Sequence, residues 1–156
     1  MGDIKFVWDK EKALDDWLIV GGDNLFTSEL AEFIQKTQSN LPNITIGVYD
    51  VGSLQEATQM GVVRLENSGK IAEFKEKPAQ PQSTLIAMCL YYFPKDTLKL
   101  IADFVKSKNS TDAAGGYIQW LVGQNRVYGF QFKGRWYDIG SLESLKEAQE
   151  HFASAR

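Results

Sequence analysis

Apolar positions along this chain recur with two different periods, which predicts a mixture of strands and helices. Continuous or alternating apolar runs bounded by turn residues predict strands. These strands cover residues 17–20, 44–50, 84–93, 126–132 and 135–140. Residues 61–78 predict a hairpin that turns at Asn67, Ser68 and Gly69. Helical spacing predicts helices over residues 27–38, 94–105, 115–123 and 142–152.

Local signals add detail to three of these elements. The run Trp17–Val20 is apolar without interruption, as in a strand that is covered on both faces. Thr27 or Ser28 can cap the helix that follows, and Ser141 can cap the last helix. The last helix carries an apolar stripe made of Leu142, Leu145 and Phe152.

The order of the elements is typical of an α/β protein with a mixed sheet and flanking helices. A chain of 156 residues, of which 44% are apolar, can bury one sizeable core. No obvious linker interrupts the pattern. We therefore expect a single domain over residues 1–156.

The composition argues against several classes of protein. The net charge is -3 with acids and bases interspersed, which gives no electrostatic footprint for nucleic acid or an anionic membrane. No stretch approaches the roughly 20 apolar residues of a membrane span, and the first residues lack the pattern of a secretory signal. The single cysteine, Cys89, lies in an apolar run and excludes disulfides within the chain. We therefore expect a cytoplasmic protein.

The first candidate for chemistry is the stretch WLIVGGDN, in which Asp23 follows a strand and two glycines. Open α/β sheets bind ligands at the carboxyl ends of their strands, and glycines let a ligand approach the backbone. A carboxylate there suits Mg²⁺, which binds one or two protein carboxylates and takes its other ligands from water and phosphate. The alternative is a plain turn, because glycine, aspartate and asparagine form turns for local reasons.

Two further stretches place charged residues directly after a strand. In RWYDIGS, Asp138 could join Asp23 at one metal ion, or could help to cap the last helix. In EFKEKP, Glu76 and Lys77 follow a strand that Pro78 ends. A lysine can bind a phosphate and a glutamate can accept hydrogen bonds from sugar hydroxyls, whereas a solvated run of charges would give the same pattern.

Together and in this order, GGDN, GVVRLENSGKIAEFKEKP and RWYDIGSLESLKEA resemble the sugar-phosphate nucleotidylyltransferase family. The glucose-1-phosphate thymidylyltransferases and their uridylyl and archaeal-type relatives are the members that it resembles most. The resemblance implies part of a Rossmann-like fold of the nucleotide-diphospho-sugar transferase type. It also implies a transferase of nucleotide-sugar biosynthesis, which joins an NTP to a sugar 1-phosphate and releases pyrophosphate.

The resemblance implies a role for each of the candidate residues. Asp23 and Asp138 would be the paired Mg²⁺ ligands and, together with Lys77, the catalytic groups. Gly61, in the stretch MGVV, would present its backbone to the sugar. Glu76 would accept hydrogen bonds from the sugar hydroxyls, and Lys77 would bind the sugar phosphate.

Three more substrate-binding residues are implied. In DAAGGYIQWL, Asp112 and Gly115 match an archaeal-type family pattern, whereas Ala114 replaces its proline. Trp136, in the stretch RWYDIG, would line the sugar pocket.

One family feature has no counterpart in this sequence. Members of the family begin with a Gly-rich loop, G-x-G-x-R-L-x-P, that cradles the triphosphate, and no stretch here matches it. The start MGDI resembles the end of the family's base-binding segment. We therefore expect a truncated nucleotidylyltransferase that keeps the sugar and metal half and needs the N-terminal nucleotide-binding segment for activity. The alternative is an inert module that binds sugar phosphate, or serves as a structural remnant, without turnover.

The same feature leads to an expectation about partners. Absence of the first parallel strands would leave an open sheet edge, which we expect at residues 17–20. A homo-oligomer, or a complementing N-terminal polypeptide that carries the nucleotide-binding half, would cover this edge. The expected small-molecule partners are a sugar 1-phosphate and an NTP.

Overall fold

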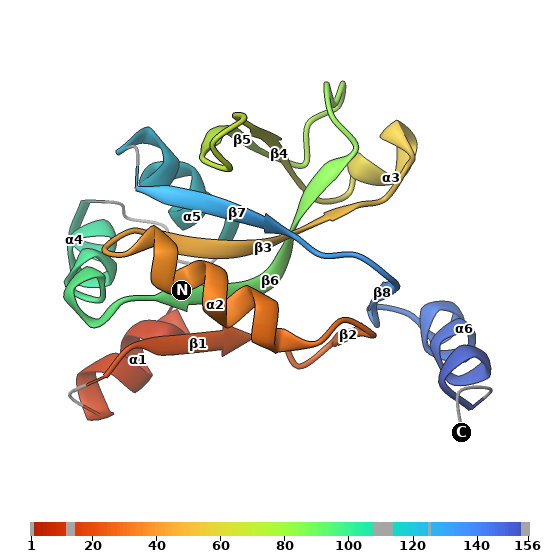
Figure 1. Ribbon diagram of the computed structural model, residues 1–156, viewed down its shortest axis with the longest axis horizontal. Helices are drawn as coiled ribbons and strands as arrows, with labels where there is room; N and C mark the ends of the chain where they lie inside the picture. Colours follow the sequence, from red (N-terminus) through yellow and green to blue (C-terminus); the bar gives the residue numbers. More distant parts are fainter. Residues whose placement is uncertain (1, 12–14, 108–113, 125, 154–156) are drawn as a thin grey trace.

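The computed structural model describes residues 2–11, 15–107, 114–124 and 126–153. Within these residues, a six-stranded sheet lies between helices on both of its faces (Figure 1). Its strands are β1 (Trp17–Val20), β3 (Ile44–Asp50), β4 (Gly61–Leu65), β5 (Ile71–Glu76), β6 (Leu85–Phe93) and β7 (Val127–Gln131). A separate two-stranded sheet pairs β2 (Asn24–Phe26) with β8 (Trp136–Asp138). The helices are α1 (Gly2–Glu11), α2 (Leu30–Asn40), α3 (Leu54–Ala57), α4 (Lys99–Ser107), α5 (Ala114–Gly123) and α6 (Leu142–Ala153), with a short 3₁₀ helix η1 (Lys95–Thr97) before α4.

Strand β6 organises the large sheet. One edge of β6 pairs with β3, and its other edge pairs with β4 near its start and with β1 near its end, all in antiparallel orientation. Strand β7 runs parallel to β3, and β5 completes the predicted hairpin with β4. The expected α/β class with a mixed sheet is therefore confirmed.

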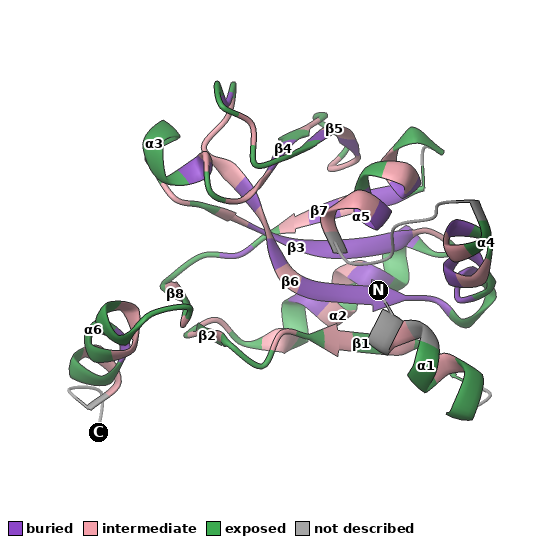
Figure 2. Ribbon diagram, turned by 180° about the vertical axis from the view of Figure 1, so that it is seen from behind, coloured by how far each residue is buried: buried purple, intermediate pink, exposed green. Residues whose placement is uncertain are grey.

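The alternation of side chains along β6 divides the interior into two cores. One core lies under α2 and contains Phe33 of that helix, which is fully buried. The β6 residues that face it are Ile86, Met88, Leu90 and Tyr92. The other core lies under α4 and α5, and the β6 residues on that side are Ala87, Cys89, Tyr91 and Phe93. Both faces of the central strands are thus covered, as the buried ribbons of β3 and β6 show in Figure 2.

The prediction that Trp17–Val20 is covered on both faces is wrong. Trp17 and Ile19 pack against the core of α4 and α5, whereas Leu18 and Val20 are 41% and 44% exposed. Helix α2 packs mainly over β3 and β7, so the face of β1 that carries Leu18 and Val20 stays partly exposed. Along its free edge β1 has no neighbouring strand within the described residues, so the expected open edge is present.

The predicted cap of the helix after β2 is also wrong. Helix α2 begins after Glu29, whose side chain makes no capping hydrogen bond. Thr27 Oγ1 instead accepts a hydrogen bond from the Arg135 backbone N–H at 3.0 Å. The Ser28 hydroxyl donates to the carbonyl of Lys133. Both hydroxyls therefore fix the segment that leads into β8, which is distant in sequence.

The last helix follows its prediction in one respect and departs from it in another. Ser141 Oγ accepts a hydrogen bond from the Ser144 N–H at 3.1 Å, so the predicted cap is confirmed. Leu142 is 79% exposed and does not belong to a buried stripe. Among the α6 residues whose burial is described, Ala148 is the buried one, and this helix contacts mainly the small sheet (Figure 1).

Candidate functional site

A cleft of about 410 Å³ opens between the β4–β5 hairpin, β6, the start of α5 and the small β2–β8 sheet. Its lining is mixed, with charged groups on two sides and a floor of small and aromatic side chains. The lining residues are Asp23, Asn24, Gln59, Met60, Gly61, Phe74, Glu76, Lys77, Ala87, Cys89, Tyr91, Gly115, Trp136 and Asp138. A cleft of this size is within the usual range for small-molecule sites.

The cleft gathers all but one of the residues that the sequence predicted. Those that line it are Asp23, Gly61, Glu76, Lys77, Gly115, Trp136 and Asp138. Asp112 lies outside the described residues. Residues separated by more than a hundred positions therefore meet at one place.

The two aspartates reach the cleft from the small sheet. Asp138 lies directly opposite Asn24 in the β2–β8 ladder, and the Ile139 N–H donates to the Asp23 carbonyl at 2.8 Å. Partial desolvation raises the pKa of the Asp138 carboxyl, the charge of Asp23 raises it further, and Lys77 acts in the opposite direction. The two carboxylates are thus close enough to interact electrostatically.

The alternative that Asp138 caps the last helix finds no support among the described hydrogen bonds. The first turn of α6 is capped by Ser141, through its bond from the Ser144 N–H. The described residues hold no group of three or more His, Cys, Asp or Glu side chains that could bind a metal ion. A pair of carboxylates nevertheless suits Mg²⁺, which prefers hard oxygen ligands and keeps several waters or phosphate oxygens.

Two glycines leave the space that the Glu76 side chain occupies. Gly61 pairs with Glu76 across the β4–β5 ladder. A Cβ added at Gly115 would lie 1.9 Å from Glu76 Oε2, and one added at Gly61 would lie 3.2 Å from the same atom. The Gly61 Cβ would also lie 2.5 Å from the ring of Phe74. A side chain at Gly115 would therefore displace Glu76, whereas one at Gly61 would clash mainly with Phe74.

Lys77 adopts a strained backbone conformation at the edge of the cleft. Its φ angle is 43°, in the left-handed region that costs a residue with a side chain about 1–2 kcal/mol. The Lys77 N–H donates to the Met60 carbonyl at 3.0 Å, which holds this conformation at the end of the hairpin. Backbone strain of this kind is concentrated at functional sites, so Lys77 is a strong candidate for a role in the cleft.

Sequence reasoning missed the floor of the cleft. Ala87, Cys89 and Tyr91 alternate along β6, so their side chains point to one face. Burial raises the pKa of the Cys89 thiol, and hydrogen bonding with Tyr91 opposes this shift. Burial also raises the pKa of Tyr91. Their alternation was the signal that could have identified them, because residues of one parity on a central strand share a face.

Asn24 was missed as a site residue although it belongs to the GGDN stretch. Its Oδ1 accepts a hydrogen bond from Trp136 Nε1 at 2.8 Å, and its Nδ2 donates to Asp23 Oδ1 at 2.8 Å. The amide thus links two residues that the sequence predicted separately.

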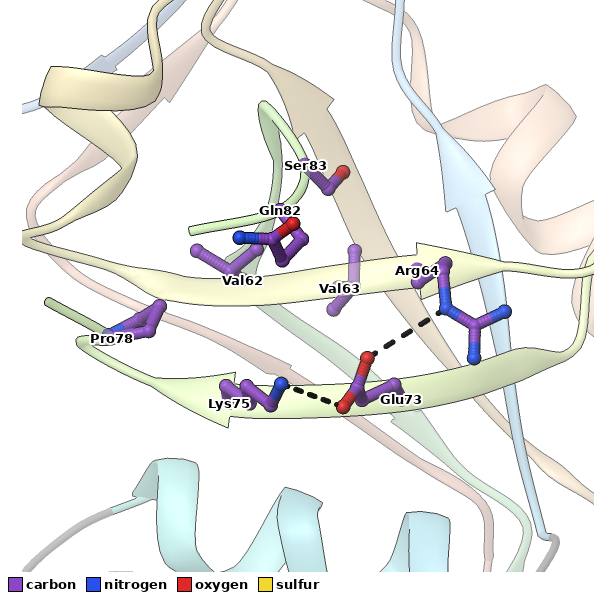
Figure 3. A pocket seen from close by; sticks show the side chains of 8 residues that line it. All are labelled: Val62, Val63, Arg64, Glu73, Lys75, Pro78, Gln82 and Ser83. Atoms are coloured by element: carbon purple, nitrogen blue, oxygen red, sulfur yellow. Dashed lines mark ion pairs between the residues drawn. The ribbon is translucent and has the colours of Figure 1, made fainter. Parts of the chain in front are cut away.

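A second cavity lies on the outer side of the hairpin (Figure 3). It measures only about 20 Å³, which is room for little more than a water molecule. Beside it, Glu73 forms ion pairs with Lys75 at 2.8 Å and with Arg64 at 3.7 Å. Such exposed pairs contribute little to stability, and this cavity is too small to be the main site.

Comparison with known proteins gives two findings. A family model described as nucleotidyl transferase matches residues 4–155. A solved structure described as a glucose-1-phosphate thymidylyltransferase from Bacillus anthracis, in complex with sucrose, superposes with a TM-score of 0.79 at 17% sequence identity. The match covers 97% of this chain and 60% of that chain, so this chain spans only part of that relative's length. Among the described helices, none has the length and apolar character needed to cross a bilayer.

Proposed function

This chain belongs to the nucleotidyl transferase family, as its motifs predicted, and on that premise we propose that its cleft binds a sugar 1-phosphate and Mg²⁺ for nucleotidyl transfer. The observation that carries the proposal is the arrangement of charge. Asp23 and Asp138 line one side of the cleft, and Glu76 and Lys77 line another. A ligand with both hydroxyl and phosphate groups fits these opposed sets.

The sugar phosphate is assigned to the hairpin side. The Lys77 ammonium group would bind the phosphate as a point charge, and the Glu76 carboxylate would accept hydrogen bonds from the sugar hydroxyls. Gly61, which also lines the cleft, would offer backbone groups to the sugar. Trp136, which is half-buried at the cleft wall, would pack its ring against the apolar face of the sugar.

The metal ion is assigned to the side of the small sheet. Asp23 and Asp138 would hold Mg²⁺, which when bound supplies positive charge to the phosphate groups. The carboxylates orient that charge, and Lys77 adds a second cation at the opposite wall. Partial burial and then the neighbouring charge of Asp23 raise the pKa of Asp138, and a bound cation would offset both effects.

In the proposed reaction, an oxygen of the sugar phosphate attacks the α-phosphorus of an NTP. The new P–O bond forms as the bond from the α-phosphorus to the bridging oxygen breaks, and that oxygen leaves with pyrophosphate. Phosphoryl chemistry of this kind depends on positioning and charge neutralisation. The protein groups needed are therefore those that bind, orient and neutralise.

We propose that the nucleotide binds to a polypeptide segment that carries the family's Gly-rich loop, because this sequence contains no such loop. The open edge of β1 supports this proposal, because strands of a partner can pair there. An apolar groove beside that edge is lined by Ile4 and Val7 of α1 together with β1. A complementing N-terminal polypeptide is the partner that we propose, and a homo-oligomer would cover the same edge.

We further propose that residues 1–156 act as one domain in the cytoplasm.

The experiment records ³¹P spectra of the chain with glucose 1-phosphate and Mg²⁺, and then with dTTP or UTP added. Binding is expected to broaden or shift the sugar-phosphate signal, and K77A should weaken binding roughly 10- to 100-fold through loss of a charge-assisted contact. K75A is the matched control, because Lys75 lies on the same hairpin and pairs with Glu73 outside the cleft. No change in the wild-type signal would refute the proposal.

The same experiment separates an enzyme from an inert binding module. Addition of a polypeptide that carries the Gly-rich loop should produce a new pyrophosphate signal if the cleft is catalytic. Binding without pyrophosphate under these conditions would favour the inert module.

A further inference from the structure

Asn24 is the first residue of β2 and forms one end of the small β2–β8 ladder, which Figure 1 shows beside the large sheet. It lies directly opposite Asp138, and Trp136 lies two residues before Asp138 on the same strand. Residues opposite one another in an antiparallel ladder share a face, as do residues two apart on a strand. Asn24, Trp136 and Asp138 therefore share one face, and Asp23 precedes Asn24 in the chain.

The hydrogen bonds at Asn24 have a fixed direction. Trp136 Nε1 donates to Asn24 Oδ1 at 2.8 Å, and Asn24 Nδ2 donates to Asp23 Oδ1 at 2.8 Å. An indole N–H can only donate, so it requires the amide oxygen of Asn24. The amide nitrogen must then point the other way, toward the Asp23 carboxylate. Trp136 thus decides which group of Asn24 faces Asp23.

Both ends of this chain of hydrogen bonds are anchored. The Trp136 ring contacts the Tyr49 ring with 5.6 Å between centroids, and the Tyr49 hydroxyl donates to the Gly134 carbonyl at 3.0 Å. At the other end, a Cβ added at Gly21 would lie 2.7 Å from Asn24 Nδ2 and 2.9 Å from Asp23 Oδ1. The amide and the carboxylate therefore pack tightly over a position where only glycine fits.

We propose that Asn24, oriented by Trp136, is a positioning residue that holds the Asp23 carboxylate ready for a divalent cation. The inference rests on the proposed function, because it takes Asp23 as a metal ligand. The amide engages Oδ1 of Asp23 and leaves Oδ2 for the cation. Asp23 is itself exposed, so without this hydrogen bond its side chain would be ordered only when the cation binds. The cost in conformational entropy would then weaken cation binding.

The test measures binding of Mn²⁺, used as the probe, by the electron paramagnetic resonance signal of the free ion. The full chain is titrated without sugar phosphate, so the sugar contacts of Trp136 do not enter. W136F keeps a ring and removes the N–H donor, and N24A removes the amide. Loss of a residue that orients a metal ligand typically costs 10- to 100-fold in affinity, so both variants should bind Mn²⁺ about 10-fold more weakly. W120F is the matched control and should bind as the wild type does, because Trp120 packs against Phe104 and Tyr117 and does not line the cleft.

The outcomes separate this inference from the function on which it rests. Wild-type affinity in W136F and N24A would overturn the positioning role and leave the proposed function in place. Failure of the wild type to bind Mn²⁺, or unchanged binding in D23N, would overturn both. If urea unfolding shows that N24A does not fold, W136F alone decides, since it retains the aromatic packing.

Discussion

Replacement of Gly115 with alanine is expected to damage sugar-phosphate binding while leaving the fold intact. The added Cβ would lie 1.9 Å from Glu76 Oε2 and 2.5 Å from its carboxyl carbon, whereas real Cβ contacts stay beyond 3.0 Å. The carboxylate must therefore withdraw by about 1.1 Å. Glu76 is exposed and can move, so the clash should displace this side chain and leave the backbone in place.

The size of the effect follows from the contact that is lost. A shift of this size stretches a hydrogen bond of ordinary length beyond the range in which such bonds are effective. A hydrogen bond to a charged group contributes about 1.5–3 kcal/mol, so glucose 1-phosphate should bind roughly 10- to 100-fold more weakly to G115A. Alanine in place of glycine inside α5 should itself favour folding by about 0.5–1 kcal/mol. Affinity and stability should therefore change in opposite directions.

The assay is isothermal titration of glucose 1-phosphate in the presence of Mg²⁺, together with urea unfolding of each variant. G116A is the matched control, because a Cβ at Gly116 meets nothing within 4 Å. It should gain similar stability and bind as the wild type does. Equal affinity in G115A and G116A would refute the reasoning, and so would a large loss of stability in G115A alone.

Three further predictions concern single groups. D138N should abolish Mn²⁺ binding and raise the melting temperature at neutral pH. The Asp138 carboxyl has a raised pKa in the folded protein, so its ionisation disfavours the folded state as pH rises. The gain in melting temperature should therefore vanish at about pH 3, where carboxyls are protonated. A lower melting temperature at neutral pH would contradict this. Y117F should leave the free energy of unfolding in urea unchanged or raise it by up to about 1–2 kcal/mol, because the Tyr117 hydroxyl is buried without a hydrogen-bond partner among the described residues. A decrease of more than about 1 kcal/mol would show that this hydroxyl has a partner. Cys89 should react slowly with iodoacetamide at neutral pH and faster above its raised pKa, because the thiolate is the nucleophile. Rapid reaction at neutral pH would show that the pKa of this thiol is not raised.

Elements with a strong local period could be predicted from the sequence. The hairpin of β4 and β5, the long strand β6 and the helices α2, α4 and α5 follow their apolar patterns, whereas α6 forms where predicted but buries Ala148 and not Leu142. Strand β2, with three residues, was missed because its pairing with β8 fixes it, and that partner lies more than a hundred residues away. Thr27 looked like a helix cap for the same reason, since the Arg135 segment that binds its hydroxyl cannot be seen locally. Helices α1 and α3 were also missed.

The candidate site was predictable only through the family's motifs. Locally, Asp23 was as consistent with a turn as with a metal ligand, and Lys77 with a solvated charge run. The motifs grouped these residues, and the cleft brings their positions together, while their roles stay predictions. Tyr91 belongs to none of these motifs, and although the alternation along β6 groups it with Ala87 and Cys89, a buried aromatic residue in a central strand usually serves packing alone. Its place beneath the cleft depends on which face of β6 the hairpin covers.

The ladder between β2 and β8 also has a consequence for the order in which this protein folds. Closing a loop of more than a hundred residues costs about 4 kcal/mol in chain entropy, and only three residue pairs in the ladder offset that cost. The small sheet should therefore form after the large sheet has brought its two segments together. During synthesis, Asp138 leaves the ribosome after every other residue of the cleft. A folding chain thus exposes its hairpin and β6 before the carboxylate pair exists, and acquisition of divalent-cation affinity would mark the final stage of its maturation.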